Sequence, residues 1–210
     1  MARPYPADTR ANFRLGMPGA NRLIGIKGAP SSCTLLWYRN AILGNCMPFQ
    51  RQVSHALDEE HRANLAFLGR VEQAFARAPR SANAGFPELA RLATSFAQQI
   101  EHDVGRHFDF EERELFPLLE AAGEGDIAGL LRDEHGAIRE VAAELLPLAR
   151  GAAAGTLDAA GWDALKRGTS ELVERQVAHI QKETMALLPM LDDLLDEETD
   201  RGLAFAYACG

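Results

Sequence analysis

The sequence predicts an all-α protein: an up-down-up-down four-helix bundle preceded by an N-terminal extension. The composition favours helices, because Ala, Leu and Glu are abundant while there are only 10 Phe, 3 Tyr and 2 Trp. After Pro48, apolar residues recur three or four positions apart, which is typical of amphipathic helices. A helical hairpin motif also occurs twice, and two such hairpins joined by short loops form a four-helix bundle.

The helical pattern is interrupted three times by short segments rich in turn residues. These breaks read APRSANAGFP, AAGEGD and RGAAAGT, and each supplies glycine or proline where a helix would end. The stretches between them are long enough for bundle helices. The four predicted helices cover approximately residues 50–78, 87–121, 125–150 and 157–196.

Charge divides the chain into two parts. Residues 1–57 hold seven basic residues and one acidic residue, so their net charge is +6, which leaves −14 for residues 58–210 out of the total of −8. Residues 1–49 lack a long period and are interpreted as a basic extension. We expect this extension to be attracted to the acidic bundle as a lid, or to bind a partner. The bundle itself is assigned to residues 50–196, followed by a C-terminal tail at 197–210.

Overall charge and hydropathy exclude several classes of protein. A net charge of −8 argues against a general nucleic-acid binder, which needs a basic surface. No apolar run approaches the roughly 18 residues of a membrane span. Cys33, Cys46 and Cys209 form no C-x-x-C motif, so a reducing cytoplasm is the simplest compartment. Each cysteine is expected to be a small buried apolar residue.

The repeated motif combines histidine, glutamate and proline at fixed spacing. HFDFEERELFPLLE begins at His107 and HIQKETMALLPMLD begins at His179; both have Glu at +4, Leu at +8 and Pro at +10. Similar segments lie upstream, LDEEHRA with His61 and LRDEHGA with His135. His61 and His107 are 46 residues apart, and His135 and His179 are 44 residues apart. The chain therefore repeats a helical hairpin of about 73 residues.

Histidine interrupts the apolar face of each predicted helix, and a glutamate follows one turn later in two of them. Burying unpartnered carboxylates costs several kcal/mol each, so a purely structural core is a poor explanation. Two metals, each with two imidazoles and both carboxylates bridging, would explain the set. Imidazole with carboxylate suits iron or manganese, and without thiolate the site is not a structural zinc site. The predicted ligands are His61, His107, Glu111, His135, His179 and Glu183.

Neighbouring titratable residues are expected to remain outside the ligand set. His55 and His102 fall off the apolar face and are predicted at the surface. Glu112 and Glu114 are also assigned to the surface. For two further glutamates, a solvated role or a role in supporting the metal ligands is favoured over ligation: Glu60 and Glu134.

This constellation resembles the haemerythrin-like (HHE) family of non-haem di-iron four-helix bundles. The resemblance covers approximately residues 50–196 and depends on EEHR, HFDFEERELFP, DEHGAI and HIQKE. It implies two iron ions bridged by an oxo or hydroxo group and by Glu111 and Glu183. Family members carry or sense oxygen, reduce peroxide or nitric oxide, or handle iron.

Three departures from the family's patterns limit what the resemblance implies. Oxygen-carrying members have H-x-x-x-H on the third helix, whereas Arg139 occupies the second of these positions here. Their fourth helix has H-x-x-x-x-D, whereas this chain has H-x-x-x-E. Members that repair iron–sulfur clusters have a paired-cysteine motif near the N-terminus, which Cys33 and Cys46 do not match.

Two functions therefore stay open, beside a purely structural bundle. The first is a di-iron redox protein that reacts with a small ligand, oxygen, peroxide or nitric oxide, with a reductase or other protein as its partner. The second is a non-enzymatic module that senses iron or oxygen, or handles iron, and signals through the N-terminal segment. Arg139 is expected either to bring positive charge to the site or to face solvent.

Overall fold

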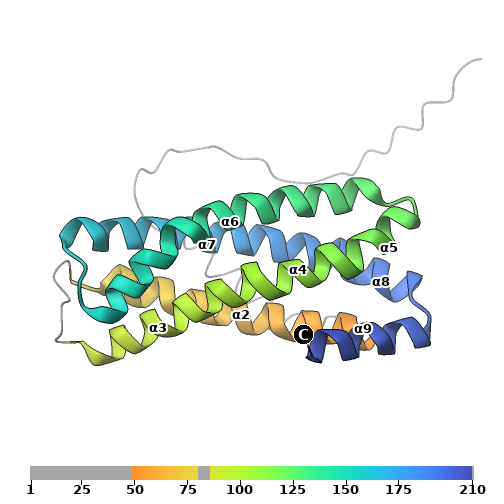
Figure 1. Ribbon diagram of the computed structural model, residues 1–210, viewed down its shortest axis with the longest axis horizontal. Helices are drawn as coiled ribbons and strands as arrows, with labels where there is room; N and C mark the ends of the chain where they lie inside the picture. The colour runs from red at the N-terminus through yellow and green to blue at the C-terminus, as the bar shows by residue number, and fades with distance from the viewer. Residues whose placement is uncertain (1–48, 80–85, 210) are drawn as a thin grey trace, which may run out of the picture. The chain divides into compact units, whose positions relative to one another are not determined.

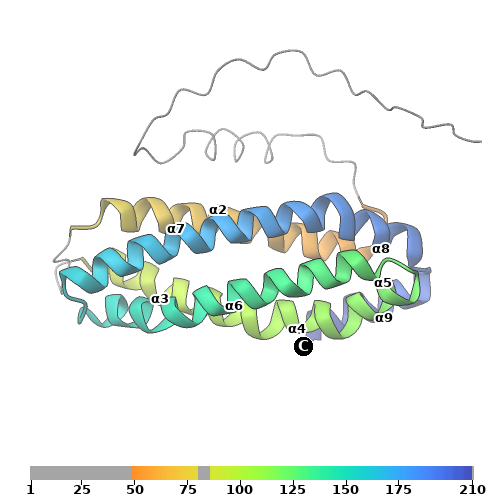
Figure 2. The ribbon, with the colours of Figure 1, turned by 90° about the horizontal axis from the view of Figure 1, so that it is seen from above.

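Helices make up almost all of the described chain, and no β-strand occurs within it. The computed structural model describes residues 49–79 and 86–209. Cys33, Cys46 and nearly all of the predicted N-terminal extension lie outside these ranges. Four long helices run side by side in alternating directions, which confirms the predicted all-α bundle (Figures 1 and 2).

Two of the four long helices are uninterrupted, and two contain short π-helical turns. Their bounds agree with the predicted helices to within a few residues. The first is α2 (Gln52–Arg77) and the third is α6 (Gly125–Ala154). The second consists of α3 (Pro87–His102), η1 (Asp103–His107), α4 (Phe108–Phe110), η2 (Glu111–Leu115) and α5 (Phe116–Ala121). The fourth consists of α7 (Ala159–Lys182), η3 (Glu183–Leu187) and α8 (Leu188–Leu194).

The ends of the long helices follow from local sequence. Gly123 (φ 91°) lies in the turn between α5 and α6, and Gly155 (φ 68°) ends α6 in the left-handed conformation that glycine tolerates. Asp158 then begins α7, because its side chain accepts a hydrogen bond of 2.7 Å from the Gly161 amide. The second and third breaks found in the sequence are thus turns between consecutive helices.

The π-helical turns η2 and η3 explain the proline in the repeated motif. Pro117 and Pro189 lie two residues after these turns. Proline lacks an N–H and crowds the carbonyl of the preceding turn, so it disfavours a regular α-helix. In each turn the next helix's first amide donates five residues back, to the carbonyl of Glu111 or Glu183. Both motif glutamates therefore begin a widened turn.

A fifth helix, α9 (Glu197–Cys209), follows the bundle and packs against α2. The sequence predicts only a C-terminal tail for this segment. Asp200 lies buried between the two helices and accepts hydrogen bonds from the Gln52 and Val53 amides at 2.9 and 3.0 Å. It therefore caps α2 from a distant part of the chain. Cys209 is exposed, so the prediction that it is buried is wrong.

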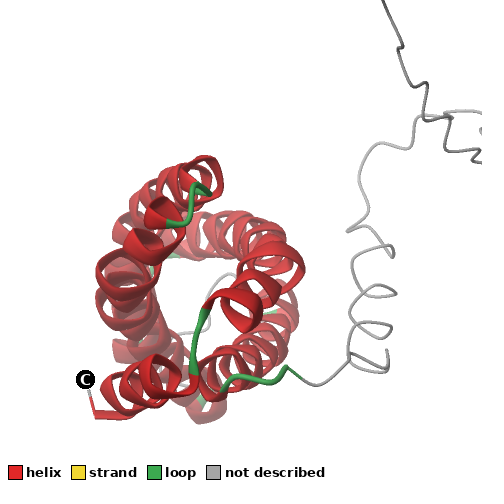
Figure 3. Cartoon of the chain, turned by 90° about the vertical axis from the view of Figure 1, so that its right-hand side faces the viewer, coloured by secondary structure: helices red, strands yellow, loops and turns green. Residues whose placement is uncertain are grey.

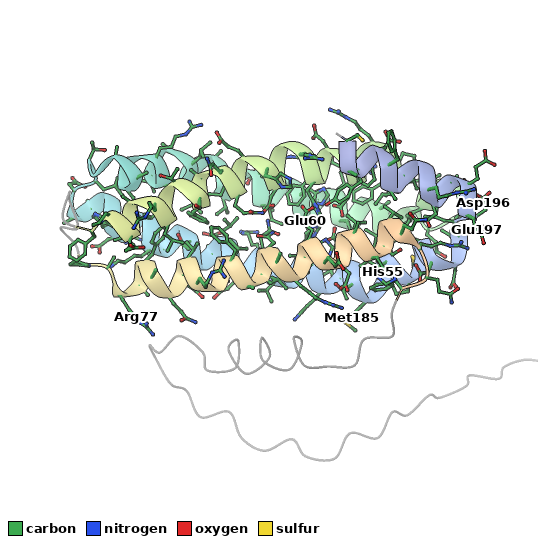
Figure 4. All side chains as sticks on the ribbon, turned by 90° about the horizontal axis from the view of Figure 1, so that it is seen from below. His55, Glu60, Arg77, Met185, Asp196 and Glu197 are labelled. Atoms are coloured by element: carbon green, nitrogen blue, oxygen red, sulfur yellow. The ribbon has the colours of Figure 1, made fainter. Side chains whose placement is uncertain are left out.

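Two apolar clusters fill the bundle on either side of a polar middle. One includes Phe75, Phe96 and Trp162, and the other includes Leu57 and Leu131. Figure 3 looks along the helices and shows them arranged around a common centre. Figure 4 places Glu60 near the middle of the bundle's length, between the ends marked by Arg77 and by Asp196 and Glu197. No helix among the described residues is both long and apolar enough to span a membrane.

Candidate metal centre

Four histidines, one from each long helix, converge in the polar middle of the bundle. The Nε2 atoms of His61 on α2 and His107 at the end of η1 are 3.3 Å apart. Those of His135 on α6 and His179 on α7 are 3.0 Å apart. None of the four side chains is more than 7% exposed. Each hairpin therefore contributes one closely spaced pair of imidazoles, as the sequence predicted.

Glu111 connects the two histidine pairs. Its carboxylate is fully buried, with Oε1 3.3 Å from His107 Nε2 and Oε2 3.2 Å from His135 Nε2. The helix η2 begins at this glutamate, one turn after His107, so the side chain projects to the same face. One carboxylate thus faces both pairs.

Glu183 makes the same connection from the opposite hairpin. Its Oε2 lies 3.2 Å from His61 Nε2, and its Oε1 lies 3.0 Å from His179 Nε2. This carboxylate is also fully buried. Glu111 on the first hairpin therefore faces a histidine of the second, and Glu183 on the second hairpin faces a histidine of the first.

The six donors form two overlapping groups that can each hold a metal ion. Within each group the donor atoms lie within 4.8 Å of one another, and both glutamates belong to both groups. None of the four carboxylate oxygens makes a hydrogen bond of good geometry within the described residues, although each lies 3.0–3.3 Å from an imidazole Nε2. Leaving buried carboxylates in this state is costly, whereas cations between them would satisfy every oxygen. The donor set thus fits two metal ions that share Glu111 and Glu183.

Protons balance the charge of this centre without metal. Burial opposes protonation of His107 and His179, but the adjacent glutamates outweigh it, raising the pKa of His107 well above its ordinary value and that of His179 to about 10. Burial lowers the pKa of His61. Burial would raise the pKa of Glu111, but His107 and His135 hold it well below its ordinary value. Imidazolium groups therefore offset the carboxylates.

The outer nitrogen of His107 is held by a glutamate and a tyrosine. Its Nδ1–H faces Glu60 Oε1 at 3.1 Å and the Tyr207 hydroxyl oxygen at 2.9 Å, while the tyrosine hydroxyl donates to Glu60 Oε2. Although burial raises the pKa of Glu60, contacts with His107 and Tyr207 lower it to about 2. A proton on Nδ1 leaves the Nε2 lone pair free for a metal. The sequence analysis missed Tyr207, which lies on α9.

The outer nitrogen of His135 is held by Glu112, which the sequence analysis placed wrongly at the surface. Glu112 Oε1 accepts from His135 Nδ1 at 2.8 Å and from Arg139 Nη1 at 2.6 Å. Arg139 also donates to Asp109 at 3.2 Å. Burial would raise the pKa of Glu112, but Arg139 and His135 lower it. Arg139 therefore acts on the centre through this glutamate.

The outer nitrogen of His179 is held by Glu134. The distance from His179 Nδ1 to Glu134 Oε2 is 3.1 Å, and Lys182 donates to Glu134 Oε1 at 2.6 Å. Hydrogen bonding to His179 lowers the pKa of Glu134 to about 2. Of the two roles expected of Glu60 and Glu134, solvated or supporting, the contacts with His107 and His179 show the supporting one. His61 differs, because its Nδ1 has no hydrogen-bond partner within the described residues.

The remaining candidates lie at or near the surface. His55 and Glu114 are exposed, as predicted. His102 is 37% exposed and its Nδ1 lies 3.7 Å from both Glu60 and Asp103. These three residues form another group of potential metal ligands. Glu60 is already hydrogen-bonded to His107 and Tyr207, however, so we assign the group to support of the centre.

A buried polar layer lies one turn from the histidines. Asp103 accepts hydrogen bonds from Asn64 at 2.9 Å, Gln99 at 2.8 Å and Gln176 at 3.5 Å. Asp103 and Gln176 also line a cavity of about 10 Å³, close to the smallest that holds one water molecule. The structure has a larger pocket of about 730 Å³, but its lining includes none of the six predicted ligands.

Phe108 packs against the histidines and was not anticipated from the sequence. Its ring stacks on His135 with centroids 3.8 Å apart and meets His179 edge-on at 5.5 Å. The Arg139 guanidinium lies 5.5 Å from the same ring on a cation–π geometry. Phe108 is 1% exposed, so it both orients His135 and excludes water.

Comparison with known families identifies the region that carries this centre. The family model described as Hemerythrin HHE cation binding domain matches residues 52–191, from the beginning of α2 into α8. All six predicted ligands fall within the match, whereas α9 lies beyond it. A comparison with curated proteins found no match.

Proposed function

Because this chain belongs to the hemerythrin HHE cation-binding family, we propose that its six buried donors hold two iron ions as a non-haem di-iron centre. Cation binding follows from the family and from the buried histidine and glutamate groups. The observation that supports two ions is that Glu111 and Glu183 each face both histidine pairs. Manganese is the alternative metal for imidazole and carboxylate donors.

The proposed ligand of the centre is small: oxygen, peroxide or nitric oxide. The cavity described one turn from the histidines has room for about one water molecule, and the largest pocket described lies elsewhere. Bound iron would supply Lewis-acid and redox chemistry to such a ligand. These observations favour a redox role on small molecules over the transformation of an organic substrate.

The chain's own residues hold and isolate the centre. The glutamates Glu60, Glu112 and Glu134 fix the tautomers of three imidazoles through their Nδ1 atoms. Phe108 covers His135 and limits water. The proposed ligands are thus oriented before metal arrives, which reduces the rearrangement that binding requires.

Metal analysis of the purified protein tests this proposal. Protein isolated without added metal should contain two iron ions per chain and have an optical spectrum of a di-iron centre. His107→Ala should lose metal, whereas His55→Ala, at an exposed position on α2, should retain it. One ion per wild-type chain, or equal metal in wild type and His107→Ala, would contradict a di-iron centre.

A sensing or iron-handling role is the alternative, and one contact favours it. Tyr207 connects His107 to α9, so a change at the centre has a direct route to a helix near the surface. Assays with a reductant and with oxygen, peroxide or nitric oxide separate the two roles. Sustained turnover supports the redox enzyme, whereas a single stoichiometric reaction supports the sensor.

A further inference from the structure

The outer hydrogen bonds of the four histidines are unequal, and this inequality distinguishes the two metal positions. We propose that the position at His61 and His107 binds its ion more weakly, and releases it sooner, than the position at His135 and His179. The inference rests on the proposed two-metal centre. It assigns different properties to two halves that the sequence repeat makes look alike.

The position at His135 and His179 has two supported imidazoles. Both Nδ1 atoms face a glutamate, and each of those glutamates is held by a cationic side chain, Arg139 or Lys182. His135 is also fixed by the stacked ring of Phe108. Such outer partners orient a ligand, and removing one typically lowers metal affinity about 10- to 100-fold.

In the part of the chain that the structure describes, the position at His61 and His107 has one supported imidazole rather than two. His61 is 2% exposed, yet its Nδ1 has no partner within the described residues. Its recorded ring contact is an edge-on approach to His107, with centroids 5.2 Å apart. Within residues 49–79 and 86–209, neither a hydrogen bond at Nδ1 nor a stacked ring holds this imidazole in place, so it gains less from preorganisation than His135.

His107 is supported, but partly by a helix outside the family domain. Its outer nitrogen faces Glu60 and the neutral hydroxyl of Tyr207 on α9. The backbone carbonyl of Tyr207 accepts a hydrogen bond of 2.8 Å from Arg106 Nη2, and Asp200 ties α9 to α2. Part of the support of this position therefore depends on α9 remaining in place, whereas the described partners of the other position, Glu112 and Glu134, lie within the bundle.

Stepwise binding of Co²⁺ to metal-free, full-length protein tests the inference without measuring activity. Cobalt absorbance and bound metal would be followed together during titration. The expected result is two ions bound in two steps, with affinities that differ by about 10- to 100-fold. Chelator should then remove the weakly bound ion first.

Variants assign each step to one half of the centre. Glu134→Ala gives His179 the same bare Nδ1 as His61, so it should weaken the tighter step until the two steps merge. Glu134→Gln keeps an acceptor and should restore part of that affinity. Glu60→Gln and, more mildly, Tyr207→Phe should weaken only the weaker step. Glu114→Gln, an exposed control, should change neither.

Each outcome bears on a different statement. Two steps of equal affinity, or Glu134→Ala weakening only the weaker step, would overturn the inequality and leave the two-metal proposal standing. Fewer than two ions bound by wild type would instead overturn the proposed function. Circular dichroism monitors the folding of each variant. If Glu60→Gln does not fold, Tyr207→Phe provides the test, because it removes a single hydroxyl. An unchanged affinity of the weaker step in Tyr207→Phe would contradict the assignment of that step to His61 and His107.

Discussion

Glu111 is expected to contribute to metal binding at both proposed positions of the centre. Its two oxygens face histidines of different hairpins, so replacing the carboxylate affects both metal positions. We expect Glu111→Gln, which keeps the shape and removes the charge, to lose both ions. Glu114→Gln, at an exposed position in the same π-helical turn, should bind as wild type does. Metal content measures the difference; loss of only one ion from Glu111→Gln would show that this carboxylate does not bridge.

Protonation of the histidines makes metal binding dependent on pH. The pKa of His179 is raised from 6.5 to about 10 and that of His107 also lies well above 6.5. Both side chains are therefore imidazolium cations in the metal-free protein at pH 7.5. Their protonation stabilises the metal-free fold fully below pH 6.5, and this contribution is lost as pH rises through the folded pKa values. Metal binding must displace these protons, so affinity should fall as pH falls.

Proton release provides the measurement. Adding a divalent metal to metal-free protein at pH 7.5 in weak buffer should release about two protons per chain, from His107 and His179. A pH indicator or calorimetry in buffers of different ionisation enthalpy would count them. His179→Ala should release fewer. Binding without proton release would mean that these imidazoles are neutral before metal arrives.

Among the contributions of α9 to stability, one comes from a buried carboxylate. Asp200 accepts from two amides at the beginning of α2, and no side chain of α2 caps that end. Replacing it should therefore act like the loss of an N-cap. We expect Asp200→Ala to lower the free energy of unfolding by about 1–2 kcal/mol. Denaturant unfolding measures this, with the exposed Asp193→Ala as control; equal stability of the two variants would contradict capping by α9.

The elements also indicate what the sequence could and could not predict. The four long helices and the six converging side chains were predictable, because each depends on periodicity and on spacing within one hairpin. Glu112 was misplaced because its partners His135 and Arg139 lie on α6, 23 and 27 residues further along the chain, where the pattern of its own helix gives no signal. Tyr207 was missed because its contacts with Glu60 and His107 span about 100 residues or more, and no local pattern announces them.

For the whole molecule, the number of histidines predicts that the protein is not a reversible oxygen carrier. The resemblance implies that oxygen carriers of the family have a further histidine one turn after the position of His135, whereas the described centre brings together four histidines. Arg139 occupies the position one turn after His135, where it pairs with Glu112 and Asp109. If the centre holds two irons as proposed, both should therefore keep a position open to solvent or ligand. Reduced protein mixed with oxygen should oxidise quickly in stopped-flow measurements, whereas oxygen uptake that reverses under vacuum would contradict this prediction.

Because Glu111 and Glu183 each face the histidine pairs of both hairpins, neither hairpin holds a complete set of donors by itself. Each hairpin supplies both imidazoles for one position but only one of the two shared carboxylates. A protease cut in the turn at Gly123 and Glu124 would leave two fragments that each hold an incomplete centre. Bound ions would then join the fragments in place of the peptide bond. We expect the two fragments to remain associated more tightly with metal bound than after chelation, because the ions would connect donors from both halves of the bundle.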